Sequence, residues 1–158
     1  MKASDLMTSD PCCCSPNDSL QEVARAMREI DCGAVPVIDE GRLVGIVTDR
    51  DLAVRALAEG KDASARVGDV MTPDPFSCSA DDDISAVKRI MTDNAVRRVP
   101  VVDSDGQCIG IVSQADLARA AADGGSLSDR EGAIVVEQIS VPRSGFSEQR
   151  SSTIEERL

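Results

Sequence analysis

The 158-residue chain contains no histidine, tryptophan or tyrosine, and its two phenylalanines are Phe76 and Phe146. Without histidine the chain can form no Ser-His-Asp triad, no Cys-His nucleophile and none of the usual histidine-containing zinc sites. The shortage of aromatic rings also removes the stacking platform on which single-strand nucleic-acid binders hold bases. No nucleophile has an activating base beside it in the sequence, so we predict that the chain is not an enzyme.

Positive charge is also scarce, because Lys and Arg total 17 against 28 Asp and Glu, a net charge of -11. Such a balance repels phosphate backbones and anionic membranes. No apolar run approaches the length that spans a bilayer, and the polar start of the chain lacks the apolar core of a secretory signal. We therefore expect a cytoplasmic protein that binds neither nucleic acid nor membrane.

The six cysteines do not have the spacing of a disulfide framework or of a zinc site. Three of them are adjacent, and no C-x-x-C pair occurs. We predict no metal site, and we expect small thiols that mostly pack as apolar groups. The cysteines are Cys12, Cys13, Cys14, Cys32, Cys78 and Cys108.

One sequence unit occurs twice, and this repeat determines the predicted organisation. Residues 5–52 align with residues 69–117 with one insertion at Asp105, and 21 of the 48 aligned positions are identical. Each unit opens with Asp-[Leu/Val]-Met-Thr, continues with Val-Pro-Val and closes with Gly-Ile-Val-[Thr/Ser]-x-x-Asp-Leu. We predict a first repeat at 1–60, a linker at 61–66, a second repeat at 67–124, and a disordered or loosely docked tail at 125–158.

Hydrophobic periodicity predicts the order β-α-β-β-α in each repeat. An extended piece at 12–14, or 76–78 in the second repeat, precedes a helix capped by Asp18 or Asp82. The first of these helices has an apolar stripe at Leu20, Val23, Ala24 and Met27. The second has its stripe at Ile84, Val87 and Met91.

A hairpin and a second helix complete each repeat. In the first repeat the apolar runs 34–38 and 43–47 are joined by a tight turn at 39–42. The second hairpin, which turns at 103–106, is one residue longer because of the insertion at Asp105. The helix that follows is expected to start at Thr48 or Ser113 and to end near Gly60 or Gly124. Neither repeat has a further layer that would cover the open face of its own sheet. The predicted fold class is therefore α/β (α+β), with two repeats packed face to face in pseudo-two-fold symmetry.

The junction between the last strand and the last helix carries the chemistry that points to a ligand. Thr48 and Ser113 place a hydroxyl at a helix N-terminus, where backbone N–H groups attract phosphate. Asp51 and Asp116 lie one turn later on the same side, where a carboxylate can accept hydrogen bonds from both hydroxyls of a ribose. The same spacing is close to a capping box, which needs no ligand, and the two roles are compatible.

Together these motifs resemble the cystathionine beta-synthase (CBS) domain, and two in tandem resemble the Bateman module of small stand-alone bacterial proteins. The resemblance covers residues 1 to about 124 and does not extend to the tail. It implies a regulatory module that binds AMP, ADP, ATP or S-adenosylmethionine in clefts between the repeats, with Mg²⁺ left open as a companion ion. It also implies a homodimer and signalling by conformational change to an effector protein that the sequence does not identify.

The resemblance implies two unequal clefts, each built from parts of both repeats. One cleft would combine Thr8, Cys13, Gly33 and Ala34 with Ser113 and Asp116. The other would combine Thr72, Ser77, Val96 and Arg97 with Thr48 and Asp51. Arg97 and Arg98 stand where the family often carries basic residues that face phosphate, although they could equally be a solvated pair at a hairpin edge. The Arg-bearing cleft is therefore the one expected to take a charged nucleotide.

Two alternatives stay open at this stage. Cys13 replaces a hydroxyl residue that would face a cleft, and its thiol could make the site sensitive to oxidation or metals, or simply pack as a small apolar group. The whole module could also be a ligand-free interaction protein that assembles through the exposed, Ala- and Leu-rich helices at 48–58 and 113–122. Such a protein would have no reason to keep both hydroxyl–carboxylate pairs.

Overall fold

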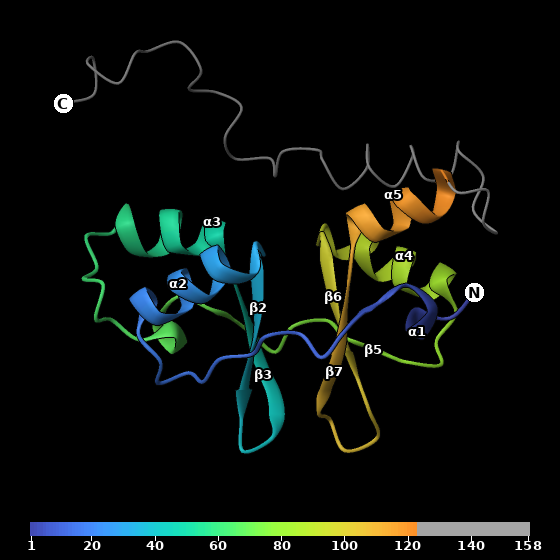
Figure 1. Ribbon diagram of the computed structural model, residues 1–158, viewed down its shortest axis with the longest axis horizontal. Coiled ribbons are helices and arrows are strands. Elements are labelled where there is room, and N and C mark those ends of the chain that lie inside the picture. Colours follow the sequence, from blue (N-terminus) through green and yellow to red (C-terminus); the bar gives the residue numbers. More distant parts are fainter. Residues whose placement is uncertain (123–158) are drawn as a thin grey trace, which may run out of the picture.

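The computed structural model describes residues 1–122, so the expectations for Gly124 and for the tail at 125–158 lie outside the described residues. The chain forms a mixed α+β fold of two lobes that stand side by side, each with a β-hairpin beside its helices (Figure 1). The predicted fold class is confirmed.

The first lobe contains most of the first repeat, in the predicted order of elements. Its elements are α2 (Leu20–Ile30), β2 (Ala34–Asp39), β3 (Arg42–Thr48), α3 (Asp49–Asp51) and the π-helical segment η1 (Leu52–Leu57). The Glu40–Gly41 turn between β2 and β3 has positive φ at both positions, 47° and 79°, as a tight hairpin turn requires. Gly60, with φ of 69°, follows the helix as predicted.

The second lobe repeats this arrangement, and two short segments lead into the repeats. The elements of the lobe are β5 (Cys78–Ser79), α4 (Ile84–Asn94), β6 (Arg98–Val102), β7 (Cys108–Ser113) and α5 (Gln114–Ala122). The lead-in segments are α1 (Ala3–Leu6) with β1 (Thr8–Ser9), and η2 (Val67–Asp69) with β4 (Thr72–Pro73).

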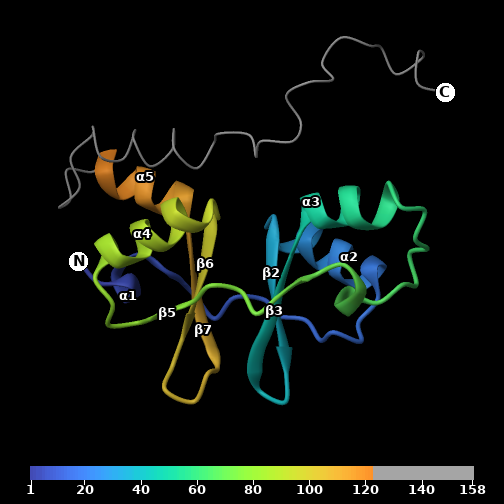
Figure 2. The ribbon, with the colours of Figure 1, turned by 180° about the vertical axis from the view of Figure 1, so that it is seen from behind.

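The lead-in strands are exchanged between the lobes. β1 pairs antiparallel with β7 of the second repeat, and β4 pairs antiparallel with β3 of the first. The sheets therefore have the strand orders β1-β7-β6-β5 and β2-β3-β4. Figure 2 shows the chain between the two repeats crossing from one lobe to the other. Each repeat thus donates its Met-Thr opening to the sheet of the other.

Glycine in the Gly-Ile-Val strand permits this exchange. A Cβ on Gly45 would lie 2.5 Å from the Met71 sulfur and 3.2 Å from the Thr72 carbonyl oxygen. A Cβ on Gly110 would collide with the Met7 side chain in the same way. The donated strand can approach this closely only because the position has no side chain.

Each hydrophobic core contains residues from the lead-in segment of the other repeat. Ala3 is fully buried in the core of the second lobe, where Leu6 and Met7 pack against it. Val67 and Val70 are buried in the core of the first lobe, together with residues of α2 and the β2–β3 hairpin. The strands and helices of one lobe are therefore covered in part by the lead-in of the other repeat.

Both predicted helix caps are one residue too early. The N-cap of α2 is Ser19, which forms a capping box with Glu22, and the N-cap of α4 is Asp83. Asp18 instead accepts a hydrogen bond from the Ser15 backbone N–H at 2.8 Å, and Asp82 does the same for Ser79. Each predicted cap therefore stabilises the turn before the helix, a role that aspartate fills equally well.

Two smaller expectations also need correction. Ala24 is exposed, so the buried face of α2 consists of Leu20, Val23 and Met27. The piece predicted at 12–14 pairs only through Cys14, which forms a parallel bridge to Val37. The buried stripe of α4 at Ile84, Val87 and Met91 is confirmed.

Candidate functional site

Both hydroxyl–carboxylate pairs form at the junctions where the sequence places them. Asp51 Oδ2 accepts the Thr48 backbone N–H at 2.9 Å and the Thr48 hydroxyl at 3.0 Å. Asp116 Oδ2 accepts the Ser113 N–H at 2.7 Å and the Ser113 hydroxyl at 2.6 Å. In return each hydroxyl oxygen accepts the backbone N–H of its aspartate, at 3.2 and 3.3 Å. Both junctions are therefore capping boxes, and the side chains of Asp51 and Asp116 are 13% and 11% exposed.

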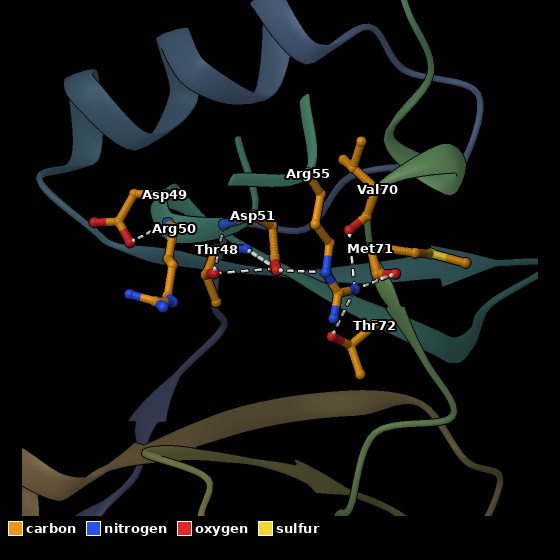
Figure 3. Close-up of polar contacts among 8 residues, drawn as sticks. All are labelled: Thr48, Asp49, Arg50, Asp51, Arg55, Val70, Met71 and Thr72. Carbon is orange, nitrogen blue, oxygen red and sulfur yellow. Dashed lines mark hydrogen bonds and ion pairs between the residues drawn. The ribbon is translucent and has the colours of Figure 1, made fainter. Parts of the chain in front are cut away.

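Arg55 connects the first junction to the strand donated by the second repeat (Figure 3). Its Nε lies 3.5 Å from Asp51 Oδ1, and its Nη1 lies 3.4 Å from the Thr72 hydroxyl. Nη1 also approaches the carbonyl oxygens of Val70 and Met71, at 3.4 and 3.3 Å. The sequence analysis missed Arg55, although its spacing of four residues from Asp51 indicates an ion pair on one helix face.

The second junction has a different cation. Arg119 forms an ion pair with Asp116 from three residues along α5, and its side chain is 70% exposed. Arg119 and Arg55 do not occupy equivalent positions of the two repeats, because Arg55 aligns with Ala120 and Arg119 aligns with Val54. The two junctions therefore share the capping box but differ in the position of the positive charge.

Strand pairing places Thr8 and Thr72 each beside the junction of the other repeat, as expected. Thr8 pairs with Ile111 on β7, two residues before Ser113. Thr72 pairs with Ile46 on β3, two residues before Thr48. Each threonine of a Met-Thr opening thus lies on the strand beside the junction of the other repeat.

The residues before the Val-Pro-Val strands lie at the same end of the hairpins. Ala34 pairs with Thr48 within its own hairpin, and Arg98 pairs with Ser113 in the other. The repeats meet where Arg98 approaches Gly33: a Cβ on Gly33 would lie 3.0 Å from both Arg98 Nη2 and Asp49 Oδ2. Arg98 therefore reaches the junction at Thr48, whereas the sequence analysis placed Arg97 in that group. Ala34 and Gly33 directly adjoin Thr48, although the sequence analysis grouped them with Ser113.

The remaining predicted residues occupy three separate places. Arg97 is exposed, and its carbonyl oxygen accepts the Gln114 N–H at 2.9 Å. Val96 is half-buried against the core of the second lobe, and Ser77 is exposed before β5. Cys13 lies beside Cys108 at the start of β7, whereas Ser113 lies at its end, roughly 17 Å away along the strand. This position separates Cys13 from the group in which the sequence analysis placed it.

Within residues 1–122, no three His, Cys, Asp or Glu side chains are grouped so that they could hold a metal ion. No helix in this range is long and apolar enough to cross a membrane.

Comparisons with known proteins connect this geometry to one family. The family model of the CBS domain matches residues 3–57 and 67–123. Hypoxic response protein 1 of Mycobacterium tuberculosis is 37% identical over 119 residues, covering 74% of this chain and 82% of its own. A crystal structure of that protein, with two coordinated zinc ions, has a TM-score of 0.69 at 36% identity and covers 75% of this chain and 98% of the solved one.

Two further solved structures contain adenosine compounds. CBSX2 in complex with AMP has a TM-score of 0.68 and is 32% identical, covering 77% of this chain and 96% of the solved one. The CBS domain pair of MJ0100, in complex with 5'-methylthioadenosine and S-adenosyl-L-methionine, has a TM-score of 0.73 and is 28% identical. It covers 78% of this chain and 98% of the solved one.

Proposed function

The chain belongs to the CBS domain family as a tandem pair, and we propose that it is a regulatory module that binds an adenosine nucleotide or S-adenosylmethionine between its repeats. The structures of CBSX2 with AMP and of MJ0100 with S-adenosylmethionine support this ligand class. A ligand that touches both repeats favours one arrangement of them over others, and this bias is the signal passed to an effector protein.

The duplicated junction is the observation that carries the proposal. Asp51 Oδ2 takes the two capping bonds, and Asp51 Oδ1 faces Arg55 at 3.5 Å. Because a carboxylate has about four acceptor positions, Asp51 can cap the helix and still accept a ribose hydroxyl. Capping also fixes the rotamer of the carboxylate before any ligand arrives, which lowers the entropic cost of binding.

The two proposed sites differ in charge. The site at Thr48 and Asp51 adds Thr72 from the donated strand and two guanidinium groups, those of Arg55 and Arg98. We therefore assign the phosphate-bearing ligand to this site, because Arg is well suited to phosphate. The second site combines Thr8 with Ser113 and Asp116. Backbone contacts to the base are assigned to the residues before each Val-Pro-Val strand, Gly33 with Ala34 in one repeat and Val96 with Arg97 in the other. Ser77 stays a proposed ligand contact.

A thermal-shift panel of AMP, ADP, ATP and S-adenosylmethionine, with and without Mg²⁺, tests the proposal. A ligand whose free concentration is one hundred times its dissociation constant stabilises the native state by about 2.7 kcal/mol. Asp51→Ala and Asp116→Ala should each abolish binding at one site, and calorimetry should count one site fewer in each variant. If no compound of the panel raises the melting temperature of the wild-type protein, the proposal is wrong.

Glu22→Ala is the matched control for the loss of a capping box. Glu22 accepts the Ser19 N–H at 2.7 Å and the Ser19 hydroxyl at 2.8 Å, which is the bonding that Asp51 gives Thr48. Each alanine variant should lose stability at its helix N-terminus, because the backbone N–H and hydroxyl of the N-cap residue lose their acceptor. Glu22→Ala must keep the full response to the ligand, because α2 carries no residue of the proposed sites.

One observation favours assembly as an accompanying property. Leu57 and Val54, on the helix that continues α3, are 78% and 48% exposed. Apolar side chains this exposed on one helix are more typical of an interface than of a free surface. We therefore propose a homodimer that associates through this helix.

A further inference from the structure

The thiols of Cys13 and Cys108 lie side by side and belong to different repeats. Cys13 belongs to the segment after β1, and Cys108 is the first residue of β7. The Cys13 sulfur also lies 3.2 Å from the carbonyl oxygen of Pro11, and the Cys108 sulfur lies 3.4 Å from that of Gly110. None of the proposed ligand contacts uses either thiol.

The backbone brings these cysteines together. β1 and β7 are antiparallel, with Ser9 opposite Gly110, and the Asp10 N–H donates to the Ile109 carbonyl oxygen at 3.2 Å. Pro11 follows Asp10 directly, so the segment that leads to Cys13 passes beside the start of β7. The Cys13 side chain is turned toward the Pro11 carbonyl oxygen, and its sulfur therefore lies beside that of Cys108.

The pseudo-symmetric copy of this arrangement has no thiols. There the Asp74 N–H donates to the Val44 carbonyl oxygen at 3.1 Å, so the backbone geometry is repeated. The residues that align with Cys13 and Cys108 are Ser77 and Leu43. The close approach is a property of the fold, whereas the pair of thiols belongs to one half of this chain.

The pKa values of the two thiols are shifted in opposite directions. The hydrogen bond from Cys13 lowers the pKa of the Cys108 thiol below its usual value of 9.0. The same contact, together with burial, raises the pKa of Cys13. Cys13 is exposed and Cys108 is half-buried, so a small oxidant can reach them. The thiolate is the nucleophilic form of cysteine.

Three of the other four cysteines are less suited to this chemistry. Burial raises the pKa of Cys14 to about 12 and that of Cys78 to about 11, so both stay protonated at neutral pH. Burial also raises the pKa of Cys32. Cys108 is therefore the thiol that should react first.

We propose that Cys108 and Cys13 are a peroxide-responsive thiol pair whose oxidation links the two repeats through a disulfide. The Cys108 thiolate attacks one oxygen of hydrogen peroxide, the O–O bond breaks, and the departing hydroxide takes up a proton to become water. Cys108 is then a sulfenic acid, oxidised by two electrons. The Cys13 sulfur attacks it, the S–S bond forms, and the hydroxyl group leaves with the Cys13 proton as a second water.

Peptide mapping of the full chain after treatment with hydrogen peroxide tests the proposal. Trypsin places Cys108 alone in the peptide 99–119 and places Cys13 with its two neighbours in the peptide 3–25. After remaining thiols are blocked, these two peptides should be recovered joined, lighter than their sum by two hydrogen atoms. Dithiothreitol should separate them, and a non-reducing gel should show the mass of a single chain.

Two serine variants identify which cysteine of the run takes part. Cys12→Ser is the matched control and should leave the joined peptides unchanged. Cys13→Ser should abolish them and let Cys108 proceed to the sulfinic acid, since the sulfenic acid no longer has a thiol to attack it. The proposal is overturned if 99–119 stays unlinked in the wild-type protein, if it links equally well in Cys13→Ser, or if the link joins two chains.

Discussion

The carboxylates that close the capping boxes have the clearest individual roles in this protein. Glu22, Asp51 and Asp116 each accept a backbone N–H and a hydroxyl at a helix N-terminus. Only the last two carboxylates also adjoin a strand from the other repeat. The same local chemistry thus stabilises one helix and is proposed to bind a ligand at two others.

The pH dependence of stability should reveal the capping bond of Glu22. The hydrogen bond from the Ser19 backbone is the main cause that lowers the pKa of Glu22 below its ordinary value of 4.5. A carboxylate with a depressed pKa in the folded state stabilises the protein above its unfolded pKa, and this contribution is lost as the pH falls through the folded value.

Glu22→Gln should therefore lower the urea midpoint near pH about 6 and have less effect near pH about 3, where the wild-type carboxylate is protonated as well. Urea denaturation of both proteins across this range measures the difference. Glu29→Gln removes a charge from the other end of α2 and serves as the comparison. An equal pH profile for the two variants would rule out the Ser19 bond as the cause.

Among the elements, the exchanged strands β1 and β4 decide how the repeats are held together. They are only two residues long, but each lies against a glycine of the neighbouring hairpin strand. The approach places the methionine of the Met-Thr opening over that glycine. It also explains why the opening and the Gly-Ile-Val strand occur together in both repeats of this chain.

Gly45→Ala should destabilise the protein by about 1–3 kcal/mol, the usual effect of an extra methyl group in a packed interior. The new Cβ would lie 2.5 Å from the Met71 sulfur. Met71→Ala removes the overlapping atoms, so the double variant should be more stable than the sum of the two single changes predicts. Denaturant unfolding of the four proteins measures this coupling. Strictly additive changes would show that Met71 does not cause the clash.

At the scale of the whole molecule, the proposed homodimer depends on the exposed apolar side chains of η1 in the first lobe. Leu57→Asp should convert the dimer to a monomer, because a carboxylate buried in an apolar interface is left without a partner. Light scattering should give a mass near twice 16.7 kDa for the wild-type protein and near 16.7 kDa for the variant. Phe76→Asp is the matched control, since Phe76 is 53% exposed and lies outside this helix. A monomeric wild-type protein would contradict the proposal.

The sequence predicted the features that depend on short stretches of chain. The order of elements follows from hydrophobic periodicity, and the capping boxes at Thr48 and Ser113 follow from a three-residue spacing. Asp18 and Asp82 were assigned one residue too early, because adjacent Asp and Ser residues can each cap a helix or close the turn before it. Only the packed structure selects between two such neighbours.

Contacts between distant segments could be decided only by the tertiary structure. Arg55 reaches Thr72, Arg98 reaches Gly33, and Cys13 meets Cys108 because β1 and β4 cross between the lobes. Hydrophobic patterning does not specify which sheet receives a two-residue strand. That choice depends on the close approach of two backbones that lie far apart in the chain. The sequence by itself therefore determined the two repeats and their junctions, and the exchange of strands decided which side chains of one repeat face the other.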